Sequence, residues 1–318
     1  MSAYIIRRLF MALVVLILAT FIVFIIMRLL PGDPILLYLS QDAYSRFTPE
    51  ELATARHEFG LDKPVVLQYF DWLSGILHGD LGKSIFKSTQ VTDEIKDALP
   101  ITLYMGLIAW LVSHVIAIPA GIICAVKRGK WIDTVLTVMA NIGITAPQFW
   151  VGILLIYIFG LYLNWLPIYG FVSPLDDLVL SIRKIIMPVF CLSLIPLSGC
   201  VRQTRSAMLE VIRQDYIRTA WSKGLRGRAV ILRHALKNGI IPVVTLAGMS
   251  IPIIIGGQVL IETVFGIPGM GRLAVNALFS RDYAIVQGIV LVIAVLVVVC
   301  NLIVDISYSW IDPRIRYD

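Results

Sequence analysis

The chain has 318 residues, of which 58% are hydrophobic and 15% charged, with a mean hydropathy of +0.85. Soluble globular domains carry about 25% charged residues, so this composition excludes that class and predicts an all-α polytopic membrane protein. The net charge of +6 does not indicate nucleic-acid binding, because the basic residues gather in short segments beside apolar runs, as topology signals do.

Six uncharged runs are long enough, or nearly so, to cross a bilayer, which takes about 20 apolar residues. They are residues 9–27, 99–126, 134–163, 185–201, 238–261 and 283–304. The first run is longer than a signal-peptide core and no cleavage pattern follows it, so we expect an uncleaved membrane helix. The fourth run is the shortest and holds Pro188 and Pro196, while Pro119, Pro147 and Pro242 predict kinks in other runs.

Basic residues in short loops predict the orientation of these spans. Arg7 and Arg8 precede the first run, and three more basic residues lie within 127–130, between the second and third runs. Positive loops favour the cytoplasm, so we expect six transmembrane helices with both termini cytoplasmic. The segment 30–98, with eleven acids and six Lys or Arg, is then an external cap.

Two later loops are also expected outside. The loop 164–184 is predicted to be a solvated external loop. The loop 262–282 contains Val264 to Gly269, an apolar, glycine-rich stretch that we expect to turn back into the mouth of the bundle. Irregular backbone at that depth must be buried in protein or line a cavity.

The segment 202–237 is the long polar stretch of an otherwise apolar chain. It carries nine Lys or Arg against Glu210 and Asp215, with apolar residues at helical spacing on either side of Gly224 and Gly227. This pattern predicts two short helices joined by a sharp turn. A surface helix that pairs with anionic lipid headgroups is the alternative interpretation of its charge.

The membrane runs lack the residues of several function classes. None of the six contains Asp, Glu, Lys or Arg, which disfavours an ion-gradient-driven secondary carrier. No catalytic motif favours a membrane enzyme, and Gly82-Lys83-Ser84 lacks the earlier glycine of a phosphate-binding loop, since position 77 is Leu. The energy for uphill transport must therefore enter from another chain, through segment 203–237.

Neutral polar residues in the runs are candidates for a translocation path. Asn141, Gln148 and Gln258 are the ones we select, with Gln287 as a further possibility. Hydrogen bonding between helices explains such residues equally well.

The stretch Asp215 to Gly224 resembles the "EAA" loop of ABC importer permeases, with Thr219-Ala220 and Gly224 in the positions of its small residues and glycine. Arg218 stands where the motif has Glu, as in the peptide/nickel branch. Further segments are similar to that branch in chain order: 30–34, 59–64, 79–82, 164–167, 233–238, 262–272 and 312–316. The likeness covers essentially the whole chain and indicates the first of two permease subunits of a dipeptide or oligopeptide importer.

The resemblance implies a type I ABC importer permease fold in a prokaryotic plasma membrane. The partners it implies are a second homologous permease, two cytoplasmic ABC ATPases that hold ATP and Mg, an extracytoplasmic solute-binding protein and membrane lipid, without nucleic acid. This chain itself would carry no cofactor, metal or catalytic residue. The residues it implies for coupling to an ATPase are Asp215, Tyr216, Arg218, Thr219, Ala220, Lys223, Gly224, Leu225 and Arg226.

The expected organisation has four parts. These are the tail and first helix (1–29), the cap (30–98), the permease core with coupling loop 202–237 (99–305) and the cytoplasmic tail (306–318). Di- and oligopeptides are the expected cargo, with nickel chelates or glutathione as alternatives, since such importers use similar permeases.

Overall fold

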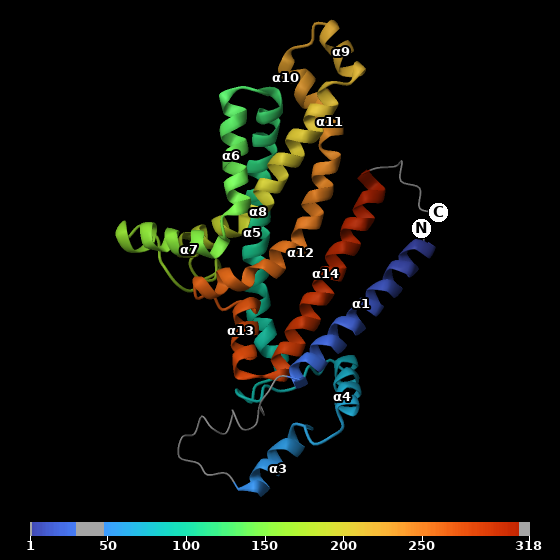
Figure 1. Ribbon diagram of the computed structural model, residues 1–318, viewed down its shortest axis with the longest axis vertical. Helices are drawn as coiled ribbons and strands as arrows, with labels where there is room; N and C mark the ends of the chain where they lie inside the picture. The colour runs from blue at the N-terminus through green and yellow to red at the C-terminus, as the bar shows by residue number, and fades with distance from the viewer. Residues whose placement is uncertain (1, 30–47, 312–318) are drawn as a thin grey trace. The chain divides into compact units, whose positions relative to one another are not determined.

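The computed structural model describes residues 2–29 and 48–311. Every element of regular secondary structure assigned within these ranges is helical (Figure 1). The motifs at 30–34 and 312–316 lie outside the described residues. The long helices are α1 (Ser2–Leu29), α5 (Val91–Val126), α8 (Leu178–Ile212), α12 (Ile241–Val264) and α14 (Tyr283–Ile311). The shorter ones are α3 (Pro49–Glu58), α4 (Val65–Leu77), α6 (Trp131–Thr145), α7 (Gln148–Leu155), α9 (Asp215–Ser222), α10 (Gly227–Ala229), α11 (Leu236–Gly239) and α13 (Met270–Ser280). Two π-helical segments complete the set, η1 (Ile156–Tyr162) and η2 (Val230–Ala235).

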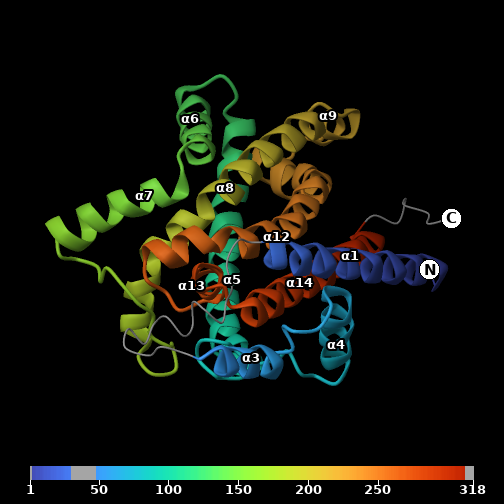
Figure 2. The same ribbon diagram turned by 60° about the horizontal axis from the view of Figure 1, so that its bottom comes forward.

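Four described helices are long and apolar enough to cross a membrane, and two bent pairs bring the total to as many as six. The pair α6 and α7–η1 covers the third predicted run, but its halves meet at 102°, so this run is not one straight helix (Figures 1 and 2). Ala146 and Pro147 at the junction have extended backbone, as expected where a proline blocks the helical conformation of the residue before it. The second pair bends by 52° near Pro242.

The chain forms two compact units, which we describe separately. Unit 1 comprises residues 1–102 and 268–298, and unit 2 comprises 103–267 and 299–318. This division runs through α5 and α14.

The core of unit 1 is apolar and joins segments far apart in the sequence. Met27, Val91, Ile95, Met270 and Ile289 are all buried in one cluster. Aromatic rings extend this core toward the cap, with Tyr69 of α4 packed edge-on against Phe21 and Phe24 of α1.

The predicted cap contains α3 and α4, but its last eight residues belong to α5, which begins at Val91. Two exposed side-chain contacts lie around α3 and α4. His57 Nδ1 lies 2.7 Å from Asp62 Oδ2, and this hydrogen bond lowers the pKa of the Asp62 carboxyl. Lys63 Nζ lies 2.6 Å from Asp71 Oδ2, which raises the pKa of Lys63.

In unit 2, small residues let helices pack closely. A Cβ placed on Gly121 of α5 would lie 2.8 Å from the backbone oxygen of Val201 in α8, and one on Gly143 of α6 would lie 2.5 Å from Ser198 Oγ. Close approach through small residues is typical of helix packing in membranes. Helix α8 therefore packs closely against both α5 and α6.

Candidate functional site

The first part of the predicted coupling segment belongs to a longer helix than the sequence indicated. Helix α8 runs on to Ile212, so residues 202–212 continue a membrane-length helix instead of forming a separate polar one. The rest confirms the predicted helices and turn, with α9 on one side and α10, η2 and α11 on the other. Figure 1 shows α9, α10 and α11 together at the end of α8.

Gly224 makes the turn that ends α9. Its φ is +74°, a left-handed conformation that favours glycine, and its N–H donates to the Trp221 carbonyl oxygen at 2.9 Å. A Cβ at this position would meet nothing within 4 Å. The turn thus needs glycine for its backbone conformation and not for space inside this chain.

The inner face of α9 packs on the chain's own core. Ile217 and Ala220 are buried in a cluster with Val230, Ala235 and Met208. Ala220, which the sequence placed among the coupling residues, is buried here, and its small side chain packs within this segment. This cluster joins α9 to α8 through Met208.

The outer face of α9 and its turn carries the other predicted residues. Exposed there are Asp215, Tyr216, Arg218, Thr219, Lys223, Gly224, Leu225 and Arg226. Arg218 lies 3.4 Å from Asp215, an exposed pair that adds little stability. We call these eight exposed residues, with Trp221, the coupling face.

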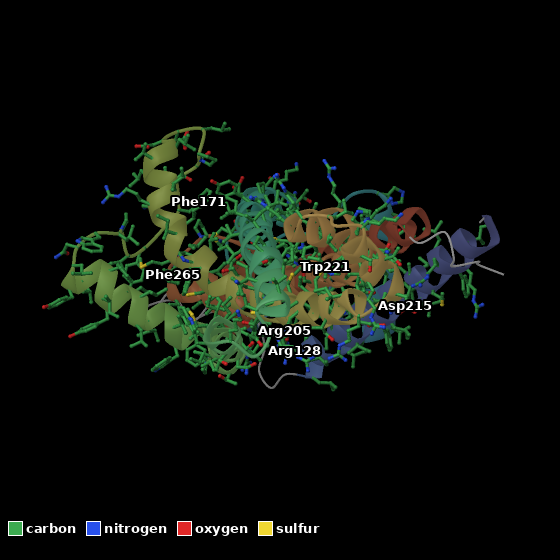
Figure 3. The ribbon with its side chains drawn as sticks, turned by 90° about the horizontal axis from the view of Figure 1, so that it is seen from above. Arg128, Phe171, Arg205, Asp215, Trp221 and Phe265 are labelled. Carbon is green, nitrogen blue, oxygen red and sulfur yellow. The ribbon has the colours of Figure 1, made fainter. Side chains whose placement is uncertain are left out.

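Trp221 belongs to this face, and sequence reasoning missed it. Its side chain is 46% exposed, beside Tyr216 at 43% and Leu225 at 40%, and a Cβ on Gly227 would lie 3.0 Å from its ring. Figure 3 shows Trp221 and Asp215 on this segment from above. Exposed aromatic residues ringed by cations are typical of interface centres, which the tryptophan in a polar stretch could have indicated.

A partly buried ion pair holds the start of α6 against α8. Arg205 donates to Asp133 from Nε at 2.7 Å and from Nη2 at 2.9 Å, and the Gly129 N–H donates to the same carboxylate at 3.0 Å. Figure 3 labels Arg205 of α8 and Arg128 of the α5–α6 turn. Sequence reasoning missed this pair, since Asp133 lies one residue outside an uncharged run.

The three predicted path residues lie on different elements. Asn141 of α6 is exposed, Gln148 at the start of α7 is half-buried, and Gln258 of α12 is fully buried. Neither amide atom of Gln258 has a hydrogen-bond partner among the described residues. It packs on Gly106 of α5, where a Cβ would lie 2.5 Å from Gln258 Nε2.

The loop after η1 packs against the turn that follows α12. The Gly170 N–H donates to the Phe265 carbonyl oxygen at 2.9 Å, and the Phe171 ring meets Tyr104 edge-on. Phe265 and Ile267 are buried, which agrees with the expected return of this turn into the bundle. The described residues contain no group of three or more His, Cys, Asp or Glu that could hold a metal.

Two family models match the chain. The model described as "Binding-protein-dependent transport system inner membrane component" matches residues 117–317, and its N-terminal counterpart matches residues 1–106.

Among similar proteins, the oligopeptide transport system permease protein AppB of Bacillus subtilis is 39% identical over 321 residues, covering all of both chains. The dipeptide transport system permease protein DppB of Escherichia coli K12 is 37% identical, covering all of this chain and 99% of DppB. A peptide transport system permease protein of Brucella abortus is 40% identical over both full lengths.

The fold also occurs in a solved structure. A chain of the MetNI methionine ABC transporter superposes with a TM-score of 0.56 at 15% identity, covering 69% of this chain and 96% of that one. At this identity the likeness concerns the fold, which is that of an ABC transporter permease.

Proposed function

The chain belongs to the inner membrane components of binding-protein-dependent transport systems, and from this membership we propose that it is a permease subunit of an ATP-driven importer of di- and oligopeptides. Relatives named as peptide permeases match it over its full length at 37–40% identity, which supports this cargo. The chain forms part of the translocation path and carries no catalysis of its own.

The assembly we propose has two such permeases, two ABC ATPases that bind ATP and Mg, and an extracytoplasmic solute-binding protein. It lies in a bacterial inner membrane, with both termini and the coupling face in the cytoplasm. The basic residues at 7–8, 127–130 and 202–237 support this orientation.

The main support for this proposal is the coupling face. Its side chains are exposed, while the opposite face of α9 is packed on the chain's own core. Its exposed aromatic and basic residues fit a groove with acidic rims on an ATPase, and its inner face rests on the cluster with Met208 of α8. Movement of α9 therefore reaches a helix of 35 residues without a flexible linker. Coupling needs such an element with discrete arrangements.

Gly224→Val tests the coupling role. Valine in the left-handed conformation costs about 1–2 kcal/mol, enough to shift the turn's population by about five- to thirtyfold. We expect ATP-driven peptide uptake in proteoliposomes to fall at least severalfold, with membrane insertion and the amount of purified complex unchanged. Gly224→Asn should keep most of the uptake, because asparagine tolerates this conformation.

Gly79→Val is the matched control, since Gly79 has a φ of +81° and equally open surroundings but lies in the cap. It imposes the same backbone strain away from the coupling face and should leave uptake near the wild-type rate. Wild-type uptake by Gly224→Val, or equal losses in both variants, would contradict the coupling role.

A further inference from the structure

A cavity of about 530 Å³ lies within unit 1, bounded by α1, α4, the loop before α5 and the start of α14. Cavities of about 300–1,000 Å³ are the usual size of small-molecule sites. The polar residues that line it include Arg28, Gln68, Asp71, Trp72, Asp80 and Gln287. It is separate from the coupling face, which belongs to unit 2.

Arg28 brings a positive charge to this cavity, and its contacts among the described residues are with the neutral side chains of Gln68, Phe24 and Tyr283. Its Nε donates to Gln68 Oε1 at 3.0 Å, and its guanidinium carbon lies 3.7 Å from the centre of the Phe24 ring. Among the described residues Arg28 makes no ion pair, and its Nη1 is buried without a hydrogen-bond partner. A covered guanidinium needs a counter-charge, which a ring face replaces only in part.

Two more donors in the same wall lack acceptors. Trp72 Nε1 and Gln287 Nε2 are buried and have no hydrogen-bond partner among the residues that the structure describes. The two acids of the wall are already engaged, because Asp71 accepts from Lys63 at 2.6 Å and Asp80 accepts from the Gly82 N–H at 2.8 Å. A ligand with acceptor oxygens would therefore satisfy groups that the protein leaves unsatisfied.

We propose that this cavity binds the carboxylate of a short peptide, with Arg28 as its ion-pair partner and Trp72 and Gln287 as further donors. The peptide assignment rests on the proposed function. It is favoured over a lipid phosphate because Asp80, which is exposed in the wall and forms no ion pair among the described residues, suits the ammonium group of a zwitterion. The three nitrogens are covered by neighbouring atoms, so binding requires small side-chain rotations in the wall.

The test is binding of alanyl-alanine to the assembled transporter in phosphatidylcholine nanodiscs, measured by calorimetry. Loss of a charge-assisted contact should weaken binding by at least about tenfold in Arg28→Gln, and alanyl-alanine amide should bind the wild type equally weakly. Lys96→Gln removes an exposed cation of the same unit outside the cavity and should bind like the wild type.

Gln287→Leu separates binding from a structural role. Leucine replaces a buried amide whose Nε2 has no acceptor among the described residues, so the ligand-free complex should melt at a higher temperature while binding weakens severalfold. A residue that served only packing would lower the melting temperature instead, and that result would count against the proposal.

Three results would overturn the inference. The first is wild-type affinity in Arg28→Gln, and the second is equal binding of the dipeptide and its amide. The third concerns a change from phosphatidylcholine to phosphatidylglycerol discs. If this change abolishes dipeptide binding to the wild type but leaves the binding of Arg28→Gln unchanged, the site belongs to a lipid phosphate. ATP-driven uptake is measured in parallel, since a wild-type transporter that imports no peptide contradicts the proposed function itself, whatever Arg28 does.

Discussion

Asp133 and Arg205 show how one contact fixes two helices that are distant in sequence. Asp133 is in the first turn of α6, Arg205 is near the end of α8, and the pair is bidentate at 2.7 and 2.9 Å. Arg205 thereby ties the α5–α6 turn to the helix that leads into the coupling face. The ion pair thus helps to fix the position of the coupling face.

Asp133→Asn should lower the stability of the complex. The amide keeps the shape but loses the charge, so Arg205, itself partly exposed, loses a contact of about 1.5–3 kcal/mol. Thermal denaturation of the purified complex measures the loss. Asp93→Asn is the matched control, because Asp93 also lies in a first helical turn but forms only an exposed pair with Lys96 at 3.6 Å. Equal melting temperatures for the two variants would show that the partly buried pair contributes nothing.

Sequence reasoning at this scale found exposed residues better than buried ones. Charged and polar residues around Gly224 were identified correctly as a surface, since charge and helical spacing are visible in one stretch of chain. The burial of Ala220 and the ion pair of Asp133 were not predicted, because they depend on Met208 and Arg205, which lie elsewhere in the chain. Only the folded structure brings these partners together.

Gly121 sets how closely α5 approaches α8. Gly121→Ala would put a methyl group 2.8 Å from the backbone oxygen of Val201, and a backbone atom cannot rotate away. The helices must separate, so we expect a lower melting temperature, with a loss of about 1–3 kcal/mol from overpacking.

Gly199→Ala in α8 is the control, because its Cβ would first meet Leu246 at 4.0 Å. It should be neutral or stabilise the helix by up to about 1 kcal/mol, since alanine favours helix more than glycine. A stabilising Gly121→Ala would show that this crossing is looser than the distances indicate.

Most membrane helices follow from their apolar runs, but their ends and bends do not. Helix α8 extends past its run 185–201 on both sides through polar residues. Polar side chains do not end a helix, because its hydrogen bonds join backbone N–H and C=O groups. The 102° break at Pro147 is much sharper than a proline kink alone predicts. Its angle depends on packing against α8 and α12, which no local pattern encodes.

At the scale of the molecule, orientation is the property most open to direct measurement. Lys87 lies in the cap and Arg226 on the coupling face, and both are exposed. A membrane-impermeant maleimide should label Lys87→Cys in intact cells, but Arg226→Cys only after the membrane is opened. Cys124, Cys191 and Cys200 are buried, and the partly buried Cys300 is first replaced by Ser to keep the background low. The reverse pattern would invert the proposed topology.

The grouping of the chain into two units was not predictable from its order. Residues 1–102 and 268–298 form one unit because cap, first helix and last helices share a buried cluster. The spans and the coupling segment were predictable since each is encoded locally. Long-range association depends on which apolar faces fit together, and one sequence alone does not state that.

The π-helical segments η1 and η2 bear on how chain length can vary in this protein. A π segment holds extra residues compared with an α-helix of the same path, and it commonly arises as a one-residue insertion. Loss of one residue within 156–162 or 230–235 could be absorbed by tightening the segment. The same loss within α8 would turn every later side chain by about 100°. Length changes between related chains should therefore gather at these two segments and spare the long helices.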